Sequence, residues 1–448
     1  MPKPLKIIAV FIATVLAIIA VATIVSVTRQ PGDGSDQTTA SQALLDHYLP
    51  DRHHPDNAMR DLMEFAEVVE STLTRVVYTD NDAPRYGVAG GLEALYKPRP
   101  SAGDNGEPPD QSTDALRRAV AQLEADGTLA RIDAALDAPI LSPQPIFDPI
   151  LPNTLLPTLA VSRPIGNLNA ARAAESLRAG NPDAALDHLS STIRLANEID
   201  QGPSLINHVI ATGVLETLLQ VWIDHATVNN TTPAALNKAD EAFSADRIAP
   251  DVTAGLESER LTAKQLIDLT HDRSLGIFLP QAFKGLVDPT AGSSPAIGTY
   301  PASATAKTIA KLPNIAGVAF ESRDQAESHV DRYYDTMTRA ATTPDPETRE
   351  RLLQQAEDAI RRLDWRQPVV GTFLPDAGRA IEATPRLERT RRLALIHTAA
   401  LRFQRNNGSP PASTADLTDA NLIDPKLLND PTSGDPLTLE DLADTQSD

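Results

Sequence analysis

The chain has 448 residues, enough for one extended helical body or for two or three domains. Its 60 acidic and 40 basic residues give a net charge of −20, which opposes the phosphate contacts of nucleic-acid binding. Cysteine is absent, which excludes disulfides, thiolate nucleophiles and cysteine-held metal sites. Aromatic residues are only 4% of the chain, and abundant Ala and Leu favour helices over sheets, so we expect a mainly α fold.

The first predicted element is a transmembrane helix at residues 7–27. These 21 residues carry no charge, and as a helix they extend roughly 30 Å, the thickness of a bilayer core. Lys3 and Lys6 precede the segment, and only Arg29 follows it closely. This bias predicts a cytoplasmic basic end at residues 1–6 and an extracytoplasmic bulk, in a single-pass protein of the inner (cytoplasmic) membrane.

A cleaved signal peptide is the competing interpretation of this segment. Ala20 and Ala22 form an A-x-A pattern, but the pattern lies inside the apolar run. A signal h-region usually has roughly 7–15 residues, fewer than this run has, so an uncleaved signal-anchor is favoured. A pilin-like leader carries a Glu near the start of its apolar run, and this run has none.

Polar residues 28–40, with Pro and Gly, predict a flexible linker to an extracytoplasmic helical domain at residues 41–384. In this domain the apolar spacing predicts helices at 56–78 and, as one short helix, at 114–135. We expect long Pro-rich loops between the helices. The loops are expected at 79–112 and 280–318, and further helices at 203–226, from 233, 250–270, 321–341 and 346–363.

Seven prolines between residues 139 and 164 predict an extended apolar strap across the helical body, because proline lacks an N–H and disfavours helix before it. Asn167 is then expected to cap a helix that ends at Gly180. Asn181 and Pro182 restart the chain as a second helix. The paired helices would form one hairpin within a larger body.

A C-terminal helix–turn unit is predicted at residues 385–442, followed by a disordered tail at 443–448. Its helix starts at about Pro385, and the sequence DPTSG at 430–434 predicts a turn.

Two stretches carry a family resemblance. AAESLRAGNPDAALDHLSSTIRLANEI (173–199) resembles a tetratricopeptide-type hairpin, and NNGSPPASTADL (406–417) with LNDPTSGDPL (428–437) resembles a closing element. With the anchor, they make the chain similar to uncharacterised membrane-anchored helical proteins of planctomycete-type bacteria. The Tyr often found in that element is replaced by Pro410. The closing element is also similar to the C-terminal part of pseudopilins, whose N-terminal methylation signal this chain lacks.

The sequence contains no GxSxG, GxGxxG, HExxH or phosphate-binding GK loop. The nearest approach to a metal cluster is DHYLPDRHHPD, where a loop could bring histidines and acids together; a polar helix-entry loop is the favoured interpretation. Its residues are His47, His53 and His54, with Asp46, Asp51 and Asp56.

Two other groups are candidate sites. His208, Thr212 and Glu216 follow i,i+4 spacing on an apolar helix. We expect this row to be the one edge of the helix that is exposed to water. The alternative is that Glu216 is a buried acid with a raised pKa. A basic patch near the C-terminus is expected to pair with acidic helices of the same chain, and the alternative is contact with an anionic partner. The patch consists of Arg386, Arg389, Arg391, Arg392, Arg402 and Arg405.

Together these features predict a non-catalytic cell-envelope protein, a membrane-anchored helical scaffold or interaction module. Its expected partners are the membrane, through residues 7–27, and other envelope proteins, with no nucleic acid. A pseudopilin-related accessory factor and an envelope enzyme with an unidentified site remain alternatives, the enzyme being less favoured. No catalytic, cofactor-binding or metal residue is assigned, and no cofactor is expected.

Overall fold

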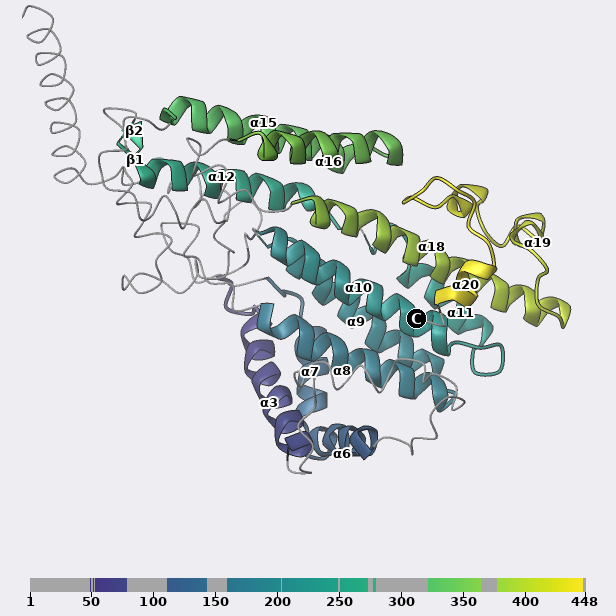
Figure 1. The fold of residues 1–448 in the computed structure, drawn as a ribbon. Helices are drawn as coiled ribbons and strands as arrows, with labels where there is room; N and C mark the ends of the chain where they lie inside the picture. Colours follow the sequence, from purple (N-terminus) through teal and green to yellow (C-terminus); the bar gives the residue numbers. More distant parts are fainter. Residues whose placement is uncertain are drawn as a thin grey trace, which may run out of the picture.

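The computed structural model describes residues 49, 51, 53–78, 111–142, 159–202, 204–248, 250–272, 277–278, 321–363 and 377–445. Over these ranges the chain is mainly helical, as the sequence predicts (Figure 1). The predicted anchor at residues 7–27 and the linker at 28–40 lie outside the described residues. The same is true of most of the two predicted long loops and of residues 143–158 of the predicted strap.

The N-terminal helices are α3 (Met59–Tyr78), α6 (Gln111–Ala125) and α7 (Thr128–Leu136). The prediction of one continuous helix at 114–135 is wrong, because Gly127 takes a left-handed conformation with φ of 78° and separates α6 from α7. Asp126 bonds the first residue of α7: its Oδ1 accepts hydrogen bonds from the Thr128 backbone N (3.0 Å) and hydroxyl (2.5 Å). The apolar period continues across the break, which hides it from a pattern search.

Helices α8 (Leu159–Arg178) and α9 (Pro182–Asp200) follow, and the strap prediction is wrong at its C-terminal end. Pro164 lies inside α8, and Asn167 is a residue of the helix interior, not its cap. Val161, Ile165 and Leu168 are fully buried on one face of α8. Burial of that face outweighs the one backbone hydrogen bond that Pro164 cannot make.

The turn between α8 and α9 is as the sequence predicts. Gly180 has a φ of 75°, the left-handed conformation that a glycine adopts without steric cost. The Asn181 side chain accepts a hydrogen bond from the Ala184 backbone N at 3.4 Å, and Pro182 opens α9.

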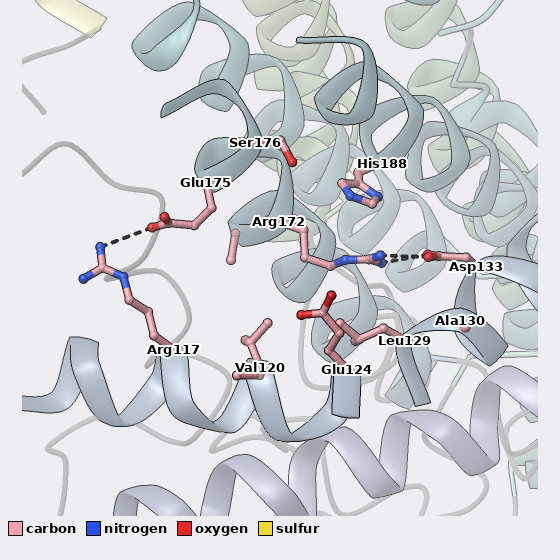
Figure 2. A pocket seen from close by; sticks show the side chains of 12 residues that line it. Arg117, Val120, Glu124, Leu129, Ala130, Asp133, Arg172, Glu175, Ser176 and His188 are labelled. Carbon is pink, nitrogen blue, oxygen red and sulfur yellow. Dashed lines mark hydrogen bonds and ion pairs between the residues drawn. The ribbon is translucent and has the colours of Figure 1, made fainter. Parts of the chain in front are cut away.

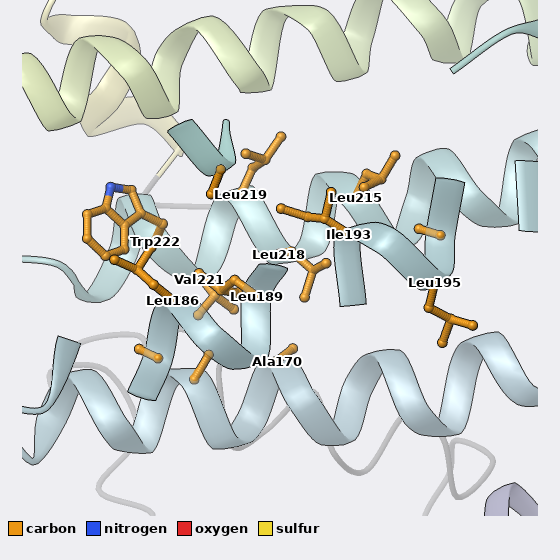
Figure 3. Close-up of a cluster of buried hydrophobic side chains, with 14 of the residues drawn as sticks. Ala170, Leu186, Leu189, Ile193, Leu195, Leu215, Leu218, Leu219, Val221 and Trp222 are labelled. Atoms are coloured by element: carbon orange, nitrogen blue, oxygen red, sulfur yellow. The ribbon is translucent and has the colours of Figure 1, made fainter. Parts of the chain in front are cut away.

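Helix α10 (Leu205–His225) is the central helix of the first core, covered by α8, α9 and α18 (Ala377–Asn407). Figure 3 shows its Leu215, Leu218 and Trp222 among side chains of α8 and α9. The Trp222 indole Nε1 donates to the Thr398 hydroxyl of α18 at 3.0 Å. Within the described ranges, α10 alone is long and apolar enough to cross a membrane, yet 56% of its most apolar window is buried inside the protein.

A second core lies beside the first. Helix α11 (Pro233–Ala242), capped by Thr232, still belongs to the first core. The second is built by α12 (Val252–Thr270), α15 (Arg323–Thr342), α16 (Pro346–Arg361) and the N-terminal part of α18. A minimal antiparallel pair, β1 (His271–Asp272) and β2 (Ile277–Phe278), follows α12.

Helix α18 belongs to both cores, and its predicted start at Pro385 is wrong. Ala380 and Ile381 pack in the second core, whereas Leu393 and Ile396 pack in the first. Pro385 lies in the interior of the helix. Short elements close the chain: α19 (Thr414–Asp419), the 3-10 helix η5 (Pro425–Leu428) and α20 (Glu440–Thr445), which extends into the predicted tail.

The two faces of α10 predict different costs of truncation. Leu218→Ala removes a fully buried side chain and should lower the free energy of unfolding by about 2–5 kcal/mol. Ile206→Ala, on the same helix but 52% exposed, should change it by less than about 0.5 kcal/mol. Urea denaturation followed by circular dichroism measures both. Equal costs would show that α10 is not oriented as described.

Candidate functional site

An open cleft of about 500 Å³ lies between α6, α7, α8 and α9, and we call it the α6–α9 cleft (Figure 2). Its floor is apolar, charged side chains from α6, α7 and α8 stand around it, and α9 contributes His188. The lining residues are Arg117, Val120, Ala121, Glu124, Leu129, Ala130, Asp133, Ala171, Arg172, Glu175, Ser176 and His188.

The strongest interaction in the cleft is a bidentate ion pair between Arg172 of α8 and Asp133 of α7. Arg172 Nη1 and Nη2 donate to the two Asp133 carboxylate oxygens, each at 2.7 Å. Nη1 also donates to Asn169 Oδ1 at 3.0 Å, and the Asn169 amide donates to the Thr192 hydroxyl of α9 at 2.9 Å. This chain of bonds fixes the guanidinium and joins three helices.

A second ion-pair group lies at the edge of the cleft. Glu175 accepts hydrogen bonds from Arg117 at 3.2 Å and from Arg178 at 2.8 Å. These side chains are 36–46% exposed, so their mutual attraction is screened by water. Both arginines that line the cleft, Arg117 and Arg172, are therefore already paired.

Two polar side chains of the cleft differ from the arginines. In the described part of the chain, no side chain or backbone group bonds the Glu124 carboxylate or the His188 imidazole. Burial, and then the nearby Arg172 cation, lower the pKa of His188 to about 4. His188 is therefore neutral at pH 7. In Figure 2 the Arg172–Asp133 pair runs between His188 above and Glu124 below.

The cleft lacks the geometry of nucleophilic catalysis. A serine nucleophile needs a base within hydrogen-bond reach. Ser176 and His188 both line the cleft, yet no hydrogen bond joins them. The arrangement suits the holding of a ligand by shape and charge.

The histidine-rich loop is described in part. His47 lies outside the described residues. His54 Nδ1 accepts a hydrogen bond from the Asp56 backbone N at 3.2 Å, a local turn contact, and His53 is exposed. Among the residues that the structure describes, no three His, Asp or Glu side chains are grouped so that they could hold a metal ion.

The expectation of a wet edge on α10 is wrong for two of its three residues. His208 and Thr212 are each 1% exposed. His208 Nδ1 lies 2.7 Å from Asp200 Oδ1, and its Nε2 lies 3.0 Å from the Thr384 hydroxyl. Asp200 Oδ2 also accepts from the Asp251 backbone N at 2.8 Å. Buried polar groups need such partners, and local sequence patterns do not reveal this one because Thr384 lies 176 residues from His208.

This Asp200–His208–Thr384 network has the order of groups found in hydrolase triads, but it is not placed as one. None of its three residues lines the α6–α9 cleft. The contacts instead join the end of α9, the start of α10, the cap of α12 and the region of α18 just before Pro385. We therefore assign it to the junction of the two cores.

Glu216, the third residue of that row, is half-buried. Burial raises its pKa, and the positive charge of Arg386 opposes the rise. Further along α10, burial raises the pKa of Asp224 to about 6. The hydrogen bond that Gln220 donates to Asp224 at 2.7 Å opposes this rise. Among the residues that the structure describes, no base or nucleophile bonds either acid, so a raised pKa alone defines no catalytic site here.

Five of the six C-terminal arginines bond within the chain, and four of these pair with acidic side chains as expected; Arg386 is exposed and makes no ion pair among the described residues. Arg389 donates to Asp430 at 2.7 Å and to Asp441 at 2.8 Å, and thereby holds the closing segment on α18. Glu388 accepts from both Arg391 and Arg392, at 2.6 and 2.7 Å. The two remaining contacts reach α11 and the residues before it. Arg402 bonds Asp240 at 2.6 Å, and Arg405 donates to the carbonyls of Val228 and Thr231.

Comparison of the chain with protein-family models, with curated proteins and with solved structures finds no match. Sequence reasoning missed the α6–α9 cleft, because Asp133 and Arg172 lie 39 residues apart with no shared motif.

The lowered pKa of His188 predicts a pH dependence of stability. The unfolded chain binds a proton at His188 below about pH 6.5, whereas the native cleft binds it only near pH 4, so stability falls as the pH drops through that window. His188→Gln should therefore lose about 1 kcal/mol less between pH 7 and pH 5 than the natural chain, after allowance for solvent screening. His271, whose pKa is also lowered to about 4 by burial, keeps part of the dependence.

Urea unfolding at the two pH values measures the difference. The matched control is His53→Gln, at an exposed histidine, which should behave as the natural chain. An unchanged pH dependence in His188→Gln would contradict the neutral state of His188.

Proposed function

We propose that this protein is a non-catalytic interaction module of the cell envelope, held at the inner membrane by residues 7–27. The observation that carries the proposal is the α6–α9 cleft. Four of its five charged lining side chains pair with one another across helices and, within the described part of the chain, Glu124 is left unpaired, with no nucleophile bonded to a base, which suits a docking surface. The mainly helical body supplies the rigid helices that line it.

The finer parts of the proposal rest on the sequence. The uncharged run at 7–27 and the preceding lysines support a signal-anchor with the bulk in the periplasm. Helices α8 and α9, joined at Gly180, support a tetratricopeptide-like hairpin, and both helices contribute to the cleft. The resemblance to membrane-anchored helical proteins of planctomycete-type bacteria is part of the same proposal.

The pseudopilin-related alternative is less well supported. It calls for residues 385–440 to pack as a helix on a small antiparallel sheet. Helix α18 lies against α10 and α11 of the first core. The antiparallel pairing described in that segment is one bridge, Asn429 with Pro436.

Capture of a partner in cells tests the interaction role. A photo-crosslinking amino acid at Ala121, on the floor of the cleft, should capture a reproducible protein, whereas the same probe at the exposed Glu350 of α16 should not. Capture at neither position under several growth conditions would contradict the role.

Protease accessibility tests the anchor. With the outer face exposed and the inner membrane intact, protease should digest nearly the whole chain and spare a short N-terminal fragment. Full protection, with release into the soluble fraction after lysis, would contradict the anchor.

A further inference from the structure

The floor of the α6–α9 cleft suits the stem of a long side chain. Val120, Ala121, Leu129 and Ala171 are apolar and line the cleft, with Ala121 exposed and Leu129 only 6% exposed. Lysine and arginine lay their methylene stems along such surfaces and keep the charged end in a polar environment.

The cleft has no free positive charge to offer an anion. The Arg172 guanidinium donates hydrogen bonds to both Asp133 carboxylate oxygens and to Asn169, and the Arg117 guanidinium is paired with Glu175. An anion would have to displace one of these carboxylates. The imidazole of His188, neutral at pH 7, adds no charge.

Acceptors, in contrast, remain available. The Glu124 carboxylate has no partner in the described part of the chain. The Asp133 side chain is 41% exposed, and each of its oxygens accepts one hydrogen bond although a carboxylate oxygen accepts more. With His188 neutral, the lining residues carry three carboxylates and two guanidiniums, a net charge of −1, and Arg178 at the edge of the cleft pairs with one of these carboxylates, Glu175.

The charge of the whole chain acts in the same direction. A net charge of −20 attracts cationic segments and repels anionic ones before contact. The local hydrogen-bond acceptors and the long-range electrostatic field therefore both favour a positively charged ligand.

We propose that the α6–α9 cleft binds a basic segment of a partner protein, with a lysine or arginine stem on the apolar floor and its charge held by Glu124 and Asp133. This rests on the proposed interaction role and adds to it the chemistry of the partner. Glu124 is the residue that determines specificity, because it is the carboxylate of the cleft without a partner of its own.

Peptide binding to the full-length protein in non-ionic detergent tests the assignment. The probes are two fluorescein-labelled peptides, one with repeated Leu-Lys-Leu and one with repeated Leu-Glu-Leu, and the readout is fluorescence anisotropy at low salt. The lysine peptide should bind and the glutamate peptide should not. Glu124→Gln should weaken binding of the lysine peptide about 5-fold, the effect of losing one partly exposed charge pair.

Glu350→Gln on α16 is the matched control. It removes the same charge from an exposed glutamate of another helix, so it leaves the net charge equal to that of Glu124→Gln. Binding should stay within about 2-fold of the natural chain, since a distant surface charge contributes little. Equal weakening by both variants, or equal binding of both peptides, would overturn the assignment.

The same variant separates this inference from the proposed function. If crosslinking at Ala121 still captures a partner in cells from Glu124→Gln at the level of the natural chain, the basic-segment assignment falls while the interaction role stands. If the lysine peptide responds to Glu124 but no partner is captured from any variant, the assignment stands while the interaction role falls.

Discussion

Helix α10 carries apolar side chains on most of its circumference, so it must be covered by other helices before the body is stable in water. Helices α8, α9 and α18 supply the cover, and the rest of the described arrangement follows from it. Trp222 anchors the α18 side through its bond to Thr398 and packs edge-on against Phe243, with ring centroids 5.8 Å apart. The α6–α9 cleft depends on the same core, because α8 and α9 form one of its walls.

The two cores are coupled where polar groups are buried. Asp200 and His208 lie between the end of α9, the start of α10 and the cap of α12, and Thr384 brings in α18. Removal of one member would leave the others buried without partners, which is costly at low dielectric. Tight packing accompanies the bonds: a Cβ added at Gly255 of α12 would lie 3.1 Å from the backbone N of Leu205.

Local rules predicted local structure well. The left-handed Gly180 and the Asn181 cap both follow from the residues beside them. Prediction failed where tertiary burial outweighs a local breaker, as at Pro164 and Pro385, both inside helices. The α6–α9 cleft could not be predicted from the sequence for another reason. Its central ion pair joins α7 to α8, and no local pattern records which charged residues of separate helices will meet.

Helix α10 is covered by other helices in the first core, so its buried face should be closed to both water and lipid. Because the chain has no natural cysteine, a single cysteine reports one position cleanly. Gly213 lies near the middle of α10, is exposed, and has open space where a side chain would point; Leu215 is fully buried. In membranes opened on both faces, a water-soluble maleimide should label Gly213→Cys readily and Leu215→Cys only after unfolding in urea. Protection of Gly213→Cys until detergent dissolves the bilayer would place α10 in lipid and contradict the account.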